Sequence, residues 1–102
     1  MKNLSISHMH WGFPPLIGGV ETHLALLLPE LVKRENNVSL LTGSHQNTPD
    51  YEEYKGVKVI RTPLLDLNWL FRRGLEGLRE ELKKTYTDFI EKNNPDIIHK
   101  HN

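Results

Sequence analysis

The alternation of strand-like and helix-like segments constrains this chain more than any other feature. Residues 4–8 alternate apolar and polar side chains, which is the period of a strand, whereas from Gly19 the apolar side chains follow a helical spacing. Further strands are expected at 37–42, 57–60 and 96–99, with a long helix before the last of them. The sequence therefore predicts an α/β domain with a largely parallel four-stranded sheet and helices on both faces.

Two helices are expected to cover this sheet. The apolar stripe of the first consists of Val20, Leu24, Leu27, Leu28 and Leu31. Pro29 should kink this helix, because proline lacks a backbone N–H. The second helix has apolar side chains three or four positions apart, at Phe71, Leu75, Leu78, Leu82, Tyr86 and Phe89. The polar segment 43–50 should be a loop, and Gly56 should lie in a turn.

Composition excludes several classes of protein. The chain has 102 residues, enough for one domain, with 37% hydrophobic and 25% charged residues. Lys+Arg and Asp+Glu are equal at 13 each, so no overall charge favours nucleic acid. The absence of cysteine excludes disulfides and favours a reducing compartment. With no apolar run that could span a bilayer and no signal-peptide pattern at the start, we expect a cytoplasmic protein.

The adjacent glycines Gly18 and Gly19 stand where the first helix should begin. Free backbone N–H groups and the positive end of a helix attract anions, and glycine lets a phosphate approach the backbone closely. The pattern matches neither the dinucleotide fingerprint nor the P-loop. A tight turn that needs positive φ explains the two glycines equally well.

Paired histidines occur near both ends of the chain. His8 and His10 alternate along one extended segment, and His99 and His101 along another, so each pair shares a face. If the first and last strands are neighbours, the four imidazoles could converge on zinc. We favour instead one histidine lining a cleft and one packed below it, and we expect no metal.

The segment 64–73 mixes aromatic and apolar side chains with Arg72 and Arg73. This mixture suits a helix that lies on a membrane surface. The interpretation we favour is that Trp69 and the leucines belong to the core while the arginines reach outward to water.

The segment "PPLIGGVETHLALLLPELVKRENNVSLLTG" resembles the first glycine-rich loop and helix of the GT-B glycosyltransferases, in particular the retaining group 1 family. The segment "NPDIIHKHN" resembles the fourth-strand motif of the same family, Pro-Asp-(apolar)-(apolar)-His-x-His. The two motifs occur in the expected order and on the expected elements, and the resemblance covers essentially the whole chain.

The resemblance implies a Rossmann-like, acceptor-side N-terminal domain spanning residues 1–102. Gly18 and Gly19 would contact the diphosphate of a nucleotide-sugar donor, and His101 would face the transferred sugar. We further expect the acceptor side of the cleft to be lined by His8, His10, Glu21 and Asn102. No cofactor is expected, and the partners would be the nucleotide-sugar and an unknown acceptor, with peripheral membrane contact as a further expectation.

Two features depart from the family pattern. Relatives commonly have Arg-Gly-His before the second strand, whereas this chain has Arg34-Glu35-Asn36, so the helix should lose its glycine stop. The donor-binding C-terminal domain is also absent, so the chain is expected to be a fragment that has no transferase activity alone. The alternatives are a non-catalytic binding module with the same fold and a small histidine-rich metal-binding protein.

The strand at 96–99 should be internal in the complete family fold and an edge in this chain. It carries Ile97 and Ile98 on opposite faces. Apolar edges invite pairing with another chain, so we expect self-association through this strand.

Overall fold

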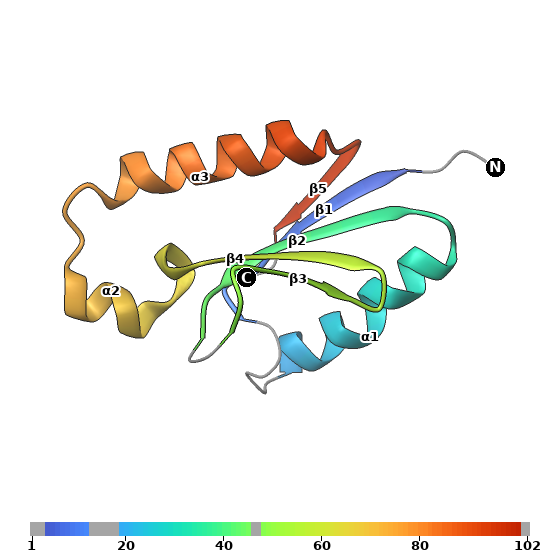
Figure 1. Cartoon of the computed structure of the whole chain (residues 1–102), viewed down its shortest axis with the longest axis horizontal. Coiled ribbons are helices and arrows are strands. Elements are labelled where there is room, and N and C mark those ends of the chain that lie inside the picture. The colour runs from blue at the N-terminus through green and yellow to red at the C-terminus, as the bar shows by residue number, and fades with distance from the viewer. Residues whose placement is uncertain (1–3, 13–18, 46–47, 101–102) are drawn as a thin grey trace.

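Five strands form one sheet in the order β3-β4-β2-β1-β5 (Figure 1). The computed structural model describes residues 4–12, 19–45 and 48–100. In chain order the elements are β1 (Ser5–Met9), α1 (Gly19–Lys33), β2 (Asn37–Gly43), β3 (Tyr51–Tyr54), β4 (Val57–Thr62), the 3-10 turn η1 (Pro63–Leu65), α2 (Leu67–Arg73), α3 (Leu78–Asn93) and β5 (Ile97–Lys100).

The predicted α/β class and the largely parallel sheet are confirmed, but the sheet has five strands rather than four. β1, β2, β4 and β5 run parallel, so their carboxyl ends meet at one edge. The additional strand, β3, pairs antiparallel with β4. Lys55 and Gly56 join the two strands with φ angles of 47° and 88°, as two-residue hairpin turns require. Only the turn was predicted, because β3 is short and contains two glutamates, which are uncommon in strands.

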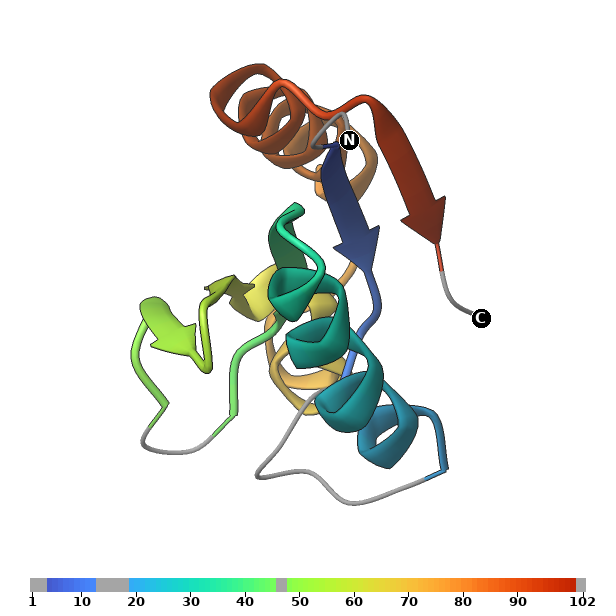
Figure 2. The same ribbon diagram turned by 90° about the vertical axis from the view of Figure 1, so that its right-hand side faces the viewer.

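One face of the sheet is covered by α1 (Figure 2). Leu24 and Leu28 of this helix are completely buried. They pack against strand side chains that alternate along β2 and β4, namely Val38, Leu40, Val57 and Val59. Leu24, Leu28 and, at its margin, Leu31 of the predicted stripe therefore belong to the main hydrophobic core, and the helix continues through Pro29 to Lys33. The kink at Pro29 stays a prediction.

The opposite face is covered by α3, as predicted. Phe89 packs there against Met9 of β1 and Leu41 of β2. Partly buried apolar side chains surround this smaller cluster, namely Ile60, Leu65, Tyr86 and Ile90. The sheet thus has helices on both of its faces, in a Rossmann-like arrangement.

The prediction of one long helix is wrong in its first half, because residues 74–77 are not helical and separate α2 from α3. Gly74 and Gly77 have φ angles of 98° and 74°, and neither position is helical. The Gly74 N–H donates to the Leu70 carbonyl oxygen at 2.8 Å, which ends α2. As a result Phe71 and Leu75 do not continue the apolar stripe of α3: they are 86% and 69% exposed.

The helix stop that the sequence was expected to lose is present in the structure. Glu35 adopts a φ of 66° in place of glycine. Its N–H donates to the Val32 carbonyl oxygen at 2.9 Å, and the Asn36 N–H donates to the Leu31 carbonyl oxygen at 3.2 Å. This pair of hydrogen bonds defines a Schellman motif. A glutamate can therefore fill the position, at the energetic cost of a left-handed backbone.

Candidate functional site

The carboxyl edge of the sheet brings together the ends of the first and last strands. β1 and β5 are adjacent and parallel, as the sequence suggested, and His8 is the register partner of His99. Their imidazole rings are 5.5 Å apart between centroids. In α/β sheets this edge is where ligands gather. The carboxyl ends of β1 and β5 therefore lie side by side.

His10 and Glu21 form a buried pair at this edge. His10 Nε2 lies 3.6 Å from Glu21 Oε1, and their side chains are only 2% and 8% exposed. The His10 N–H donates to the Leu41 carbonyl oxygen at 3.1 Å, which ties the end of β1 to β2. Glu21 lies in the first turn of α1, where the helix dipole favours a negative charge. The pair therefore connects the end of β1 to the start of α1.

Two glycines near this pair have close neighbours on the side where a Cβ atom would be. A Cβ atom on Gly12 would lie 2.5 Å from Glu21 Oε1, so a larger residue there would displace this carboxylate. A Cβ atom on Gly43, the last residue of β2, would lie 2.5 Å from the Trp11 carbonyl oxygen and 2.7 Å from that of Leu65. Both positions explain a glycine without any ligand.

Gly19 differs from these two glycines. It is the first residue of α1, it is exposed, and a Cβ atom there would meet nothing within 4 Å. Its φ lies outside the positive range that favours glycine. The turn that could have explained this glycine is therefore not present at Gly19, and no described neighbour requires its small size.

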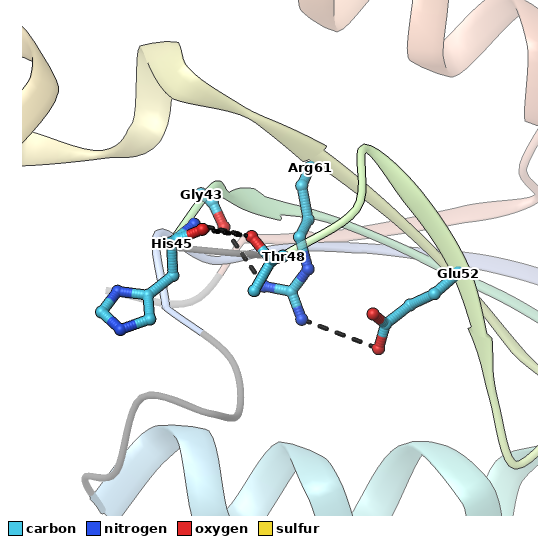
Figure 3. A network of polar contacts seen from close by, with 5 residues as sticks. All are labelled: Gly43, His45, Thr48, Glu52 and Arg61. Carbon is cyan, nitrogen blue, oxygen red and sulfur yellow. Dashed lines mark hydrogen bonds and ion pairs between the residues drawn. The ribbon is translucent and has the colours of Figure 1, made fainter.

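A buried arginine at the same edge was not predicted. Arg61 of β4 is 4% exposed; its Nη1 donates to the Gly43 carbonyl oxygen at 3.3 Å, and its Nη2 lies 3.8 Å from Glu52 Oε1 (Figure 3). Burial lowers the pKa of the guanidinium, and the Glu52 carboxylate acts in the opposite direction. The group nevertheless remains a cation. It therefore holds β2, β3 and β4 together where the loop of His45 and Thr48 begins.

The signal for Arg61 was present in the sequence. Val57 and Val59 alternate on the face that α1 covers, and Arg61 is the next residue in that series. Thr42 is its register partner on β2, and the fully buried Thr42 hydroxyl has no hydrogen-bond partner among the described residues. A period-two pattern that ends in a charged residue marks the point where an apolar face becomes polar.

The predicted site residues are only partly covered by the structure. His8, His10 and Glu21 lie at the carboxyl edge and are buried. Gly18, His101 and Asn102 lie outside the described residues. Within the described part of the chain, no group of three or more metal-ligating side chains is found. None of the helices described here has the length and apolar character that crossing a bilayer requires.

Comparison with known families gives a match over most of the chain. The sequence model of the family described as glycosyltransferase family 4 matches residues 17–102. The chain belongs to glycosyltransferase family 4. No curated protein and no solved structure gives a significant match.

The family match begins just before the adjacent glycines and extends through the last histidine motif. It therefore contains the first motif from Ile17 onward, with both glycines, and the whole of the second motif. It does not contain β1 or the His10 side of the buried pair. As a glycosyltransferase-related domain, the chain presents the start of α1 and the end of β5 at one edge of its sheet.

Proposed function

We propose that the chain is the N-terminal, acceptor-side domain of a group 1 retaining glycosyltransferase with the GT-B fold. The complete enzyme transfers a sugar from a nucleotide-sugar donor to an acceptor in the cytoplasm. Gly18 and Gly19 contact the donor diphosphate, and His101 faces the transferred sugar. His8, His10, Glu21 and Asn102 lie on the acceptor side of the cleft.

The observation that carries this proposal is the open space at Gly19. A glycine that is exposed, has no positive φ and has no close neighbour fulfils no structural requirement in the described chain. Close approach of a ligand to the backbone is a physical reason for keeping glycine at such a position.

The chemistry follows from where charge develops during sugar transfer. As the bond between the sugar and the diphosphate breaks, negative charge grows on the leaving phosphate oxygens. Backbone N–H groups at the start of α1 are fixed donors that stabilise this charge without reorganisation. The His101 imidazole offers a hydrogen bond to a hydroxyl of the transferred sugar. The parallel pairing of β1 and β5 supports bringing these two groups to one cleft.

The isolated chain is expected to be inactive as a transferase. Closing two domains around the donor supplies positioning worth as much as roughly 7–11 kcal/mol, which a single domain cannot provide. Measurable transfer by the purified 102-residue chain would contradict this part of the proposal.

The experiment uses a fusion of this chain to the donor-binding domain of a group 1 relative, and it compares two glycine variants. Gly19→Ala should leave the thermal midpoint unchanged, because the added methyl group meets nothing. It should lower kcat/KM for the donor by about tenfold or more, because the methyl group occupies the space through which a phosphate approaches the backbone N–H groups, and one such contact is worth about 100-fold or more. Gly43→Ala, by contrast, should destabilise the domain through its clash with backbone oxygens.

A Gly19→Ala variant with full activity would refute the diphosphate contact. The role of His101 is tested separately with His101→Ala in the same fusion. Loss of a hydrogen bond that is used mainly in the transition state lowers kcat more than it raises KM. If KM rises while kcat is unchanged, His101 binds the donor but does not take part in transfer.

A further inference from the structure

Glu21 is a buried carboxylate in the first turn of α1, two positions after Gly19. Its side chain is 8% exposed, and the side chain of His10, which it faces, is 2% exposed. Side chains that are this enclosed contact other atoms of the protein rather than a molecule that arrives from solution. Taking a carboxylate out of water is also costly unless the fold gains an interaction from it. The burial of Glu21 therefore indicates a role inside the domain.

The Glu21 carboxylate contacts the segment that follows β1. Its Oε1 atom lies 3.6 Å from His10 Nε2, and a Cβ atom on Gly12 would lie 2.5 Å from the same oxygen. This segment is itself fixed to β2, because the Gly43 N–H donates to the Trp11 carbonyl oxygen at 3.0 Å. The carboxylate therefore links the first turn of α1 to a stretch of backbone that the sheet holds in place.

The first turn of α1 has few other anchors. Gly19 is exposed, and a Cβ atom there would meet nothing within 4 Å. Thr22 and His23 are also exposed, and the completely buried side chains of the helix begin at Leu24. Among the described side chains of the first turn, Glu21 is thus the one that packs inside the domain.

We propose that Glu21 is a positioning residue for the anion site at the start of α1. The first N–H groups of a helix have no partner within the helix, so the placement of the first turn decides where they point. This role rests on the proposed function, in which these N–H groups face the donor diphosphate. It goes beyond that function because Glu21 acts through the segment after β1 and touches neither donor nor acceptor.

The charge of Glu21 opposes the binding of an anion at this site. The helix dipole stabilises a carboxylate in the first turn, but that carboxylate repels a phosphate that approaches the same turn. If Glu21 acted through its charge alone, removal of the charge would strengthen phosphate binding, and the length of the side chain would not matter. If Glu21 positions the turn, the length of the side chain matters more than its charge. Aspartate and glutamine separate the two effects.

The test measures binding of inorganic pyrophosphate to the purified 102-residue chain at one pH, through the backbone amide NMR signals of Gly19 and its neighbours in α1. Glu21→Asp keeps the charge but withdraws the carboxylate from His10 and Gly12. The dissociation constant should therefore rise roughly fivefold, as for a misaligned hydrogen bond to a charged group. Glu21→Gln keeps the length, so it should bind pyrophosphate at least as tightly as the parent chain. Glu30→Asp is the matched control, because the Glu30 side chain is 58% exposed on the same helix.

A second variant disturbs the same carboxylate from the other side. Gly12→Ala places a methyl group against Glu21 Oε1 and should weaken pyrophosphate binding to a similar degree. The losses should not add in the double variant Gly12→Ala/Glu21→Asp, because both changes act through one carboxylate. The double variant should therefore bind roughly fivefold, and not about 25-fold, more weakly than the parent chain. Thermal unfolding verifies that each variant is folded.

The possible failures of the two proposals are distinguishable. If the α1 amides of the parent chain do not respond to pyrophosphate, the diphosphate contact of the proposed function is contradicted, and the positioning role falls with it. If the parent chain binds pyrophosphate and Glu21→Asp and Gly12→Ala leave binding unchanged, the positioning role alone is overturned. Additive losses in the double variant, or an equal loss in Glu30→Asp, would also overturn it. None of these measurements depends on glycosyl transfer.

Discussion

The half of the domain built around α1 is packed differently from the half built around α3. Under α1, six side chains form one cluster in which none is more than 2% exposed. Under α3, the cluster contains three buried side chains, and a hollow of about 250 Å³ extends between the helix and β2 and β4. The two edges of the sheet also differ: β3 carries Glu52 and Glu53, whereas β5, the strand that follows α3, exposes Ile97 and Ile98.

The difference indicates that the two halves have different tasks. The α1 half packs α1 against β2 and β4 in one close-packed unit, and Glu21 of the candidate site lies at the start of this helix. The segments on either side of α3 leave apolar groups exposed, at Phe71 and Leu75 before the helix and in β5 after it. Buried apolar area supplies most of the folding free energy. We therefore expect the α1 half to dominate stability and the α3 half to dominate association.

The largest expected effect is a loss of stability in the α1 half. Leu28→Ala should lower the free energy of unfolding by about 2–5 kcal/mol, because its neighbours cannot collapse into the cavity. Phe89→Ala removes a larger side chain, but Phe89 already lines an open hollow. The loss in the free energy of unfolding should therefore be smaller than for Leu28→Ala. Urea unfolding of both variants measures the difference. A larger loss for Phe89→Ala would show that the α3 half is the more tightly packed.

The second effect concerns the two sheet edges. Ile97 and Ile98 are 46% and 45% exposed on β5, and β1 is the only neighbour of this strand in the described sheet. We propose that two copies pair along β5 about a two-fold axis, where Ile98→Lys would place like charges in the interface. Light scattering at increasing concentration should show dimers for the parent chain and monomers for Ile98→Lys. A parent chain that stays monomeric at all concentrations would contradict the pairing.

A smaller effect is expected from the buried arginine. Glu52→Gln removes the carboxylate next to Arg61 and should destabilise the domain by about 1 kcal/mol, since the pair is 3.8 Å apart and Glu52 is one-third exposed. The pKa of Arg61 should fall further, because the Glu52 charge opposes the effect of burial. Glu53→Gln on the opposite face of β3 is the matched control. Equal effects in the two variants would mean that the pair does not stabilise the edge.

The smallest effect should be stabilising. Glu35→Gly places glycine at the residue with φ of 66° that ends α1. Relief of the left-handed backbone should raise the free energy of unfolding by about 0.5–1 kcal/mol. The change in the urea midpoint measures it. No gain would indicate that the Glu35 side chain compensates for its backbone conformation.

Local periodicity determined the class of this fold and most of its elements. The apolar stripe of α1 and the alternation in β1, β2 and β4 were sufficient for an α/β sheet with helices on both faces. They also predicted that His8, His10 and His99 lie at one edge, which the structure confirms, whereas the position of His101 stays a prediction. These signals are local, because each depends on the spacing of side chains along one element.

Tertiary structure decided what local spacing could not. Phe71 and Leu75 fit a helical period, yet Gly74 and Gly77 interrupt the helix and leave both side chains in solvent. The partners of Arg61 and His10 come from other elements, so their burial depends on packing between those elements. The space around each glycine is likewise set by tertiary structure. A Cβ atom on Gly12 or Gly43 would meet atoms of other segments, whereas a Cβ atom on Gly19 would meet nothing within 4 Å. A sequence specifies which residues are small, and only the folded chain shows which of them have nothing beside them.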